Sequence, residues 1–132
     1  MINNYILKHA HLNEKEIYDS YKIFFGTLVS EPRLKIINLL RDKKRNVSEI
    51  MKNLKMDQTS VSHNLARLKR CGFVEIEVKG KFRYYKLNEE TINPLMTLID
   101  KHMARHCVYI LKSDKKSSSL NFQKKIQKGG KK

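Results

Sequence analysis

The sequence has few of the features that define membrane, secreted or disulfide-rich proteins. It contains two cysteines, Cys71 and Cys107, in 132 residues. Two cysteines outside a Cys-x-x-Cys pair cannot form a disulfide framework, and they are typical of a reducing compartment. No apolar run approaches the ~18 to 20 residues of a membrane-spanning helix, and the N-terminus lacks the pattern of a secretory signal peptide. We therefore expect a cytoplasmic protein with no membrane contact.

Catalytic motifs are also missing. There is no Ser/His/Asp arrangement, glycine-rich phosphate loop, carboxylate pair or zinc-hydrolase motif. Ser62 and His63 are adjacent, but neighbouring side chains on a helix do not face each other. The sequence therefore predicts that the protein is not an enzyme.

Acidic residues are scarce relative to basic ones. The chain has 13 Asp and Glu against 28 Lys and Arg, a formal net charge of +15. Such an excess favours a polyanionic partner, first nucleic acid and second an anionic membrane surface. The length predicts one domain with a modest core.

Capping signals divide the first 72 residues into four predicted helices. The first begins at Asn13 with a capping box, and the second begins at the Ser-Glu-Pro-Arg segment 30–33. Asn46 caps a short third helix. After a tight turn, Asp57 caps the fourth helix, which we place at 57–71. Gly72 can adopt the left-handed conformation that ends it.

The fourth helix and the segment that follows it form a recognisable pattern. One helix face carries Val61, Leu65 and Leu68, whereas the other is polar and basic. Residues 73–78 and 82–87 are β-prone, and Lys79-Gly80-Lys81 forms the turn between them. We predict a mainly α fold with a β-hairpin wing (α+β), in the order α-α-α-α-β-β-α. This is a winged helix-turn-helix.

The second helix of a helix-turn-helix places its N-terminal residues at base edges in the major groove. Glutamine can pair with adenine, Ser and Thr can bond to bases or phosphates, and basic wing residues contact the backbone. The candidate DNA-binding residues are Gln58, Thr59, Ser60, Ser62, His63, Arg67, Lys79, Lys81 and Arg83. A solvated Ser/Thr face is the alternative for the helix alone. The short turn, the basic hairpin and the charge together favour DNA.

A last helix is predicted from about residue 94 to 111, with more apolar surface than docking on one small domain requires. Its strongest apolar stripe consists of Ile92, Met96, Ile99, Met103, Cys107 and Ile110. Such a patch indicates a partner, and the simplest partner is a second copy.

The ends of the chain differ from the middle in composition. Residues 112–132 hold eight lysines and one aspartate, a net charge of +7, and have little to bury. We predict a flexible N-terminus at 1–12, a DNA-binding and dimerisation domain at 13–111 and a disordered basic tail at 112–132. The tail either slides along phosphates or keeps the protein soluble.

Three stretches carry a family resemblance: "FFGTLVSEPRLKIINLL", "NVSEIMKNLKMDQTSVSHNLARLKRCGFVEIEVKGKFRYYKL" and the helix after them. Together they resemble the ArsR/SmtB-type winged helix-turn-helix repressors over about residues 17–111. The resemblance implies a homodimer built from the first and last helices. It also implies a repressor that a signal, often a metal ion, releases from its operator.

The metal sites of that family are not reproduced. Many relatives carry a Cys-x-Cys-type motif where this chain reads "NVSEI". The positions of the family's last-helix site fall on Glu89, Thr91, His102 and Arg105, of which two can bind metal. Neither site is supported.

A different constellation on the last helix remains a metal candidate. His102 and His106 are four residues apart and share a helix face, with Cys107 adjacent. His9 and His11 are further ligands that could complete a site for Zn²⁺ or another divalent transition metal. The alternative is that the helix dipole favours these histidines and that Cys107 packs as a small hydrophobe.

The leading hypothesis is a dimeric, sequence-specific DNA-binding transcriptional regulator. It would act as a repressor that reads an inverted repeat in double-stranded DNA with helix 57–71 and wing 73–87. The alternative is a non-specific nucleic-acid-binding or packaging protein that uses the same fold and the lysine-rich tail. A winged-helix module that binds protein is disfavoured by the basic wing.

Overall fold

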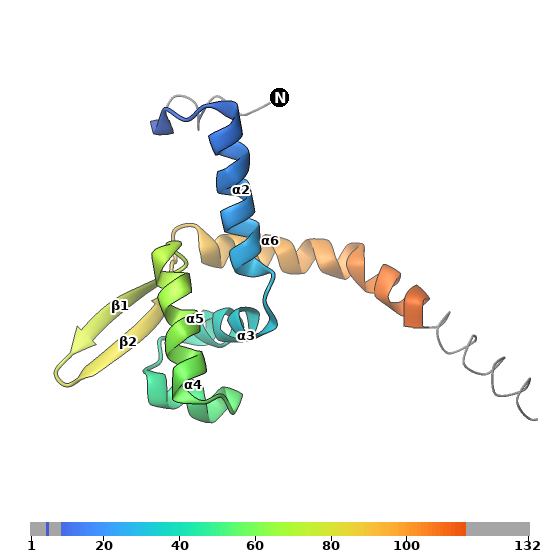
Figure 1. Cartoon of the computed structure of the whole chain (residues 1–132). Helices are drawn as coiled ribbons and strands as arrows, with labels where there is room; N and C mark the ends of the chain where they lie inside the picture. Colours follow the sequence, from blue (N-terminus) through green and yellow to red (C-terminus); the bar gives the residue numbers. More distant parts are fainter. Residues whose placement is uncertain (1–4, 6–8, 116–132) are drawn as a thin grey trace, which may run out of the picture. The chain divides into compact units, whose positions relative to one another are not determined.

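The computed structural model describes residue 5 and residues 9–115 of the chain. It divides into two compact units, one ending at Ile92 and the other beginning at Asn93, and each is described by itself. The elements are α2 (Glu14–Leu28), α3 (Glu31–Asp42), α4 (Val47–Leu54), α5 (Gln58–Arg70), β1 (Val74–Lys79), β2 (Phe82–Leu87) and α6 (Ile92–Arg105). Figure 1 shows these elements along the chain. The predicted order of helices and strands is confirmed.

The helix starts lie where the capping residues placed them. The side chain of Asn13 accepts a hydrogen bond from the Glu16 amide at 2.9 Å, and Asn46 does the same for a second capping box. Asp57 caps α5 by accepting from the Ser60 amide at 2.7 Å. Between α4 and α5, Lys55 takes a left-handed conformation with φ 54°, which ends α4 sharply. These caps fix where α4 ends and where α5 begins.

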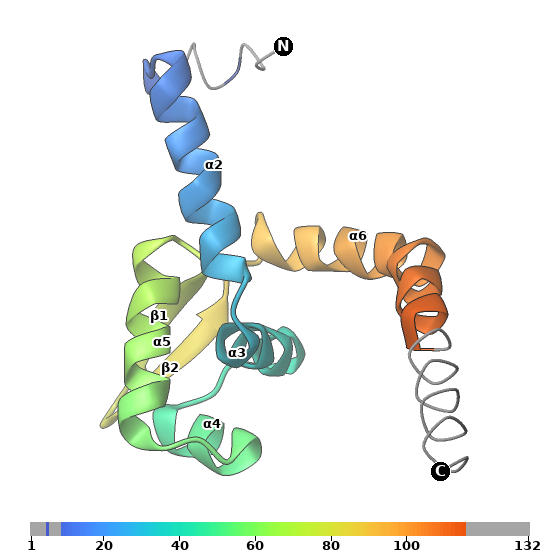
Figure 2. The ribbon, with the colours of Figure 1, turned by 45° about the vertical axis from the view of Figure 1, so that its right-hand side comes forward.

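The core of the first unit lies between the inner faces of its helices and the base of the hairpin. Both Figure 1 and Figure 2 show α5 lying against α4, with the wing extending beside it. Among the fully buried side chains are Ile17, Ile36, Ile37, Leu40, Ile50, Val61, Leu65, Leu68, Phe73 and Leu87. The Phe73 ring lies 5.1 Å from that of Phe24 on α2, between ring centroids. The inner face predicted for α5 is therefore confirmed.

A short connection joins α5 to the wing. Gly72 has φ 76°, a backbone conformation that residues with a side chain rarely adopt, and it ends the helix as predicted. The Phe73 amide donates to the Leu68 carbonyl at 2.9 Å, and the Phe73 carbonyl accepts from the Asn88 amide. Phe73 thus belongs to the helix end rather than to the strand, and β1 begins one residue later than predicted.

The wing is a two-stranded antiparallel hairpin whose turn is shorter than predicted. Lys79 pairs with Phe82, so Lys79 is the last strand residue, and Gly80 and Lys81 alone make the turn. Gly80 has φ 61°, as a tight hairpin turn requires. Arg45 forms a short antiparallel bridge with β2, because its amide donates to the Tyr85 carbonyl and its carbonyl accepts from the Tyr85 amide. This bridge joins the loop before α4 to the wing.

The second unit is helical. After α6 the chain makes a turn at His106, and helical residues continue from 107 to 115. The single helix predicted for residues 94–111 is therefore interrupted, and helical structure continues four residues into the predicted tail. Its exposed apolar side chains include Leu98, Met103, Val108, Tyr109, Ile110 and Leu111.

Parts of the predicted end segments lie outside the described residues. These parts are residues 1–4, 6–8 and 116–132. Within the described part of the chain, no helix has the length and apolar character needed to cross a membrane.

Candidate nucleic-acid interface

The outer face of α5 presents a group of polar side chains near the N-terminus of the helix. Gln58, Thr59, Ser62 and His63 are all exposed. The helix that carries them is fixed by its opposite face, where Val61 and Leu65 are buried in the core. The helix therefore offers amide, hydroxyl and imidazole groups on a rigid support, which suits hydrogen bonding to base edges.

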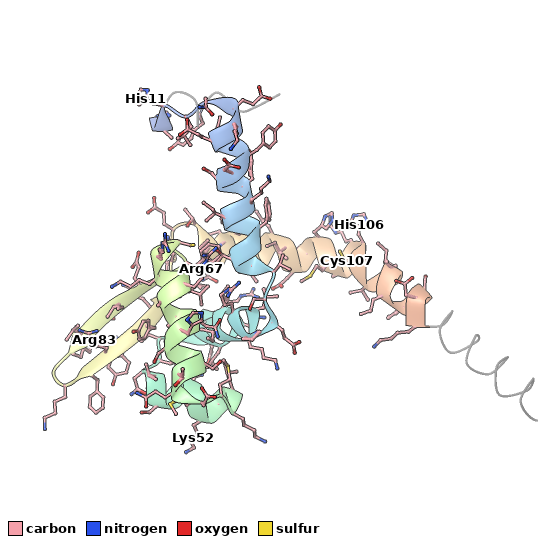
Figure 3. The ribbon with its side chains drawn as sticks, in the orientation of Figure 1. His11, Lys52, Arg67, Arg83, His106 and Cys107 are labelled. Carbon is pink, nitrogen blue, oxygen red and sulfur yellow. The ribbon has the colours of Figure 1, made fainter. Side chains whose placement is uncertain are left out.

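Two other predicted residues are partly engaged within the protein. Ser60 is half-buried, and its carbonyl accepts from the Asn64 side chain at 2.8 Å. Arg67 is also half-buried, and its Nε donates to the hydroxyl of Thr27 at 3.2 Å. In Figure 3, Arg67 lies at the end of α5 nearer to α2, and Arg83 lies on the wing. Ser60 and Arg67 are thus positioned by contacts within the protein, unlike their fully exposed neighbours.

The hairpin register distributes the basic residues over both wing faces. Residues directly opposite each other in an antiparallel pair share a face. Lys79 is opposite Phe82, whereas Arg83 is opposite Val78, one position along, and so lies on the other face. Lys81 is in the turn. All three basic side chains are exposed, and together they surround the wing tip with positive charge.

Lys44, in the loop after α3, anchors one face of the wing. Its ammonium donates to the Glu77 carboxylate at 2.9 Å and lies 5.5 Å from the centroid of the Tyr84 ring. The hydrogen bond from Lys44 lowers the pKa of Glu77, and the bond to Glu77 raises the pKa of Lys44. The nearby Lys44 also lowers the pKa of Lys79. The wing's orientation thus depends in part on one charge-assisted contact.

That contact predicts an acid-sensitive wing. The folded-state pKa of Glu77 lies below its unfolded value, so its stabilising contribution is present above about pH 4.3 and is lost as the pH falls through the folded pKa. In an NMR pH titration, we expect a depressed Glu77 carboxyl pKa that returns toward the ordinary value in Lys44→Gln. The Lys35→Gln variant, which loses an ion pair with Glu31 instead, should not move it. An unchanged Glu77 titration in Lys44→Gln would show that this contact does not form.

The structure places further basic residues beside the candidate interface that sequence reasoning did not include. Lys44 belongs to a polar break, "RDKKRN", with no local signal for its contact with the wing. Arg33 and Arg70 join Arg67 around a hollow on the outer side of α5. Arg70 had a partial signal, because it follows His63 by seven residues and so shares its helix face.

Among the described residues, the metal candidate on the last helix consists of two neighbouring histidines. The rings of His102 and His106 lie 4.6 Å apart, between centroids, so the two share a face as predicted. Cys107 is exposed. His9 stacks on Tyr5. Residue 5 and residues 9–115 contain no group of three or more His, Cys, Asp or Glu side chains arranged to hold a metal ion. These residues therefore do not supply a full ligand set.

The described elements define a winged helix-turn-helix DNA-binding protein. They are a short helix, a tight turn, a second helix with an exposed polar N-terminal half, and a basic hairpin. Comparisons with known proteins extend this assignment. Residues 30–75 match the model of the family described as bacterial regulatory protein, arsR family.

Two curated relatives come from Bacillus subtilis. The HTH-type transcriptional regulator YbzH is 35% identical over 86 residues, which cover 54% of this chain and 86% of the relative. The transcriptional repressor SdpR is 32% identical over 78 residues, covering 55% of this chain and 87% of the relative. The solution structure of the homodimeric winged helix-turn-helix DNA-binding domain of Mb0332 from Mycobacterium bovis is also similar. It has a TM-score of 0.66 and 27% identity, covering 74% of this chain and 93% of that one.

The chain belongs to the ArsR family of bacterial regulatory proteins. It is a DNA-binding transcriptional regulator with a winged helix-turn-helix fold.

Proposed function

We propose that this protein acts as a homodimeric repressor that reads an inverted-repeat operator with α5 and the wing. The observation that carries the proposal is the exposed group Gln58, Thr59, Ser62 and His63 beside a basic hairpin. In this arrangement the helix residues supply sequence discrimination, and Lys79, Lys81 and Arg83 supply affinity for phosphates. The repressor role is supported by the relative SdpR, which is a transcriptional repressor.

The dimer is supported by apolar surface on α2. Tyr21, Ile23 and Phe25 are exposed by 40%, 54% and 55%. A groove of about 420 Å³ on the same helix is lined by Ile17, Ser20, Tyr21, Phe24 and Phe25. Exposed apolar patches of this kind mark interaction sites. The last helix carries further exposed apolar side chains, and the Mb0332 domain is a homodimer.

A twofold dimer determines the form of the expected operator. Two copies of α5 should enter successive major grooves, with half-site centres about 34 to 36 Å apart. We place this activity in the cytoplasm, where its DNA target lies. Residues 13–111 would supply both DNA binding and dimerisation, and the basic tail would add affinity without sequence choice.

Selection from a random duplex library tests the proposal. At ~150 mM salt, where non-specific contacts are weak, the purified chain should enrich an inverted repeat. A chain ending at Lys115 should enrich the same repeat. Equal retention of all duplexes, abolished in the shortened chain, would instead identify a non-specific packaging protein. The selection is repeated with Zn²⁺ and with chelator to detect release by metal.

Gln58→Ala should erode discrimination at one base pair in each half-site. Gln58 is the first residue of α5 and is exposed, so its amide can make two hydrogen bonds to adenine. Losing such a pair should reduce discrimination by about 1 to 3 kcal/mol. Competition binding with operators substituted at each position measures this effect.

Lys81→Ala is the matched comparison for Gln58→Ala. It should weaken operator and unrelated duplexes equally and lower the salt slope by about one per protomer. If Lys81→Ala changed base preference and Gln58→Ala did not, the roles assigned to helix and wing would be wrong.

A further inference from the structure

A positively charged hollow lies on the outer side of α5 and begins at His63, the last of the residues assigned to base reading. It has a volume of about 480 Å³ and is lined by Arg33, His63, Ala66, Arg67 and Arg70. Four of these five residues carry basic side chains. Ala66 leaves room between His63 and Arg70, because it projects only a methyl group from the same helix face.

The Arg33 guanidinium is held rigidly beside this hollow. Its Nε donates to the Thr27 carbonyl at 2.7 Å, and one terminal nitrogen donates to the Gly26 carbonyl at 3.1 Å. The other terminal nitrogen lies 3.5 Å from the side-chain oxygen of Asn64. Arg67 is held by Thr27 in turn. Both cations are thus positioned before any ligand arrives, which lowers the entropic cost of binding one.

Within the described part of the chain, the three arginines of the hollow have no acidic partner. Among the described residues, no ion pair involves Arg33, Arg67 or Arg70. Arginine clusters without carboxylates favour oxyanions, because the guanidinium fork matches phosphate geometry. The ligand expected here is therefore a phosphate group.

The position along α5 indicates where that phosphate comes from. Gln58 and Arg70 are separated by twelve residues, which is about 18 Å along a helix. The major groove is about 12 Å wide. When the N-terminus of α5 lies at the base edges, its C-terminal end therefore reaches the sugar–phosphate wall of the groove.

We propose that this hollow is a phosphate-binding pocket that receives a backbone phosphate of the bound DNA, with Arg33 and Arg70 as members of the DNA interface. The inference rests on the proposed function, since it requires α5 to enter the groove. The pocket would fix how far the helix advances along the groove, which sets which base pairs meet Gln58 and Ser62.

Arg70 provides the cleanest test, because it is exposed and its substitution removes no hydrogen bond described above. Arg70→Gln should bind any duplex about 5- to 10-fold more weakly at ~150 mM salt and lower the salt slope by about one per protomer. Arg70→Lys keeps the charge but loses the guanidinium fork, so its affinity for DNA should lie between those of the wild type and Arg70→Gln. Lys69→Gln removes a charge from the next position of α5, outside the hollow. It should have the smaller effect.

Neutral methylphosphonate linkages identify the phosphate itself. Each position of the selected repeat is substituted in turn, and binding is measured for the wild type, Arg70→Gln and Lys69→Gln. At one position in each half-site, the substitution should weaken the wild type about 5- to 10-fold and should weaken Arg70→Gln clearly less, because only the remaining cations of the hollow still contact that phosphate. Equal losses in wild type and Arg70→Gln at every position would overturn the proposal.

A final arm separates DNA from a soluble anion. Inorganic phosphate is titrated into the DNA-free protein while the NMR signals of the arginine Nε–H groups are followed. Tight binding of free phosphate together with no methylphosphonate coupling would identify a small-anion site and overturn the DNA assignment. The salt slopes of wild type and Arg70→Gln can be compared on any duplex, so the pocket is tested even if no operator is enriched.

Discussion

Replacing Phe73 with alanine should lower the free energy of unfolding by about 3 to 5 kcal/mol. Phe73 is fully buried, and its ring packs 5.1 Å from the Phe24 ring, between centroids. It lies where α5, the wing and α2 meet, so the surrounding groups have little freedom to collapse into the cavity. Urea unfolding followed by circular dichroism, at one fixed protomer concentration, measures the loss.

Phe82→Ala is the control for that experiment. Phe82 is 55% exposed at the wing tip, so the same truncation should change the unfolding free energy by no more than about 0.5 kcal/mol. Similar losses for the two variants would contradict the core described here.

The second large effect concerns the wing. Lys81→Gln combined with Arg83→Gln should weaken binding to every duplex on the order of 10²- to 10³-fold at ~150 mM salt. Two lost phosphate contacts per protomer, doubled in a dimer, should reduce the slope of log K against log salt by about 3.6. Fluorescence anisotropy across a salt series measures the loss of affinity and the change in slope. The operator and a scrambled duplex should show the same change in slope.

A charge-matched variant separates wing contacts from the general field of the protein. Lys15→Gln combined with Lys22→Gln removes the same charge from α2, where both lysines are exposed. This variant should retain most of the affinity and most of the slope. If it matched the wing variant, the binding would depend on net charge and not on the hairpin.

The helix boundaries could be predicted because their causes are local. Asn13, Asn46 and Asp57 each cap a helix through an amide three residues away, so a short stretch of sequence contains both partners. The buried face of α5 and the end at Gly72 follow from periodicity and backbone preference in the same way. The exposed polar residues near the N-terminus of α5 could be predicted from the same helical periodicity.

The contacts that organise the charged groups could not be predicted. Lys44 bonds to Glu77, 33 positions away, and Arg67 bonds to Thr27, 40 positions away. Arg33 approaches Asn64 across 31 positions. No local pattern encodes such pairings, because they depend on how helices and loops pack in three dimensions. The turn at His106 was missed for a different reason, since the apolar stripe continues through it.

The bridge between Arg45 and Tyr85 has a consequence for the DNA. Two backbone hydrogen bonds attach the wing to the loop before α4, and α4 in turn packs on α5. The spacing between α5 and the wing is therefore set by the protein, and a duplex that meets both must adjust its groove widths to match. The free energy needed to deform the duplex in this way differs between flexible pyrimidine–purine steps and stiff A-tracts with a narrow minor groove. We expect operator preferences at base pairs that no side chain touches.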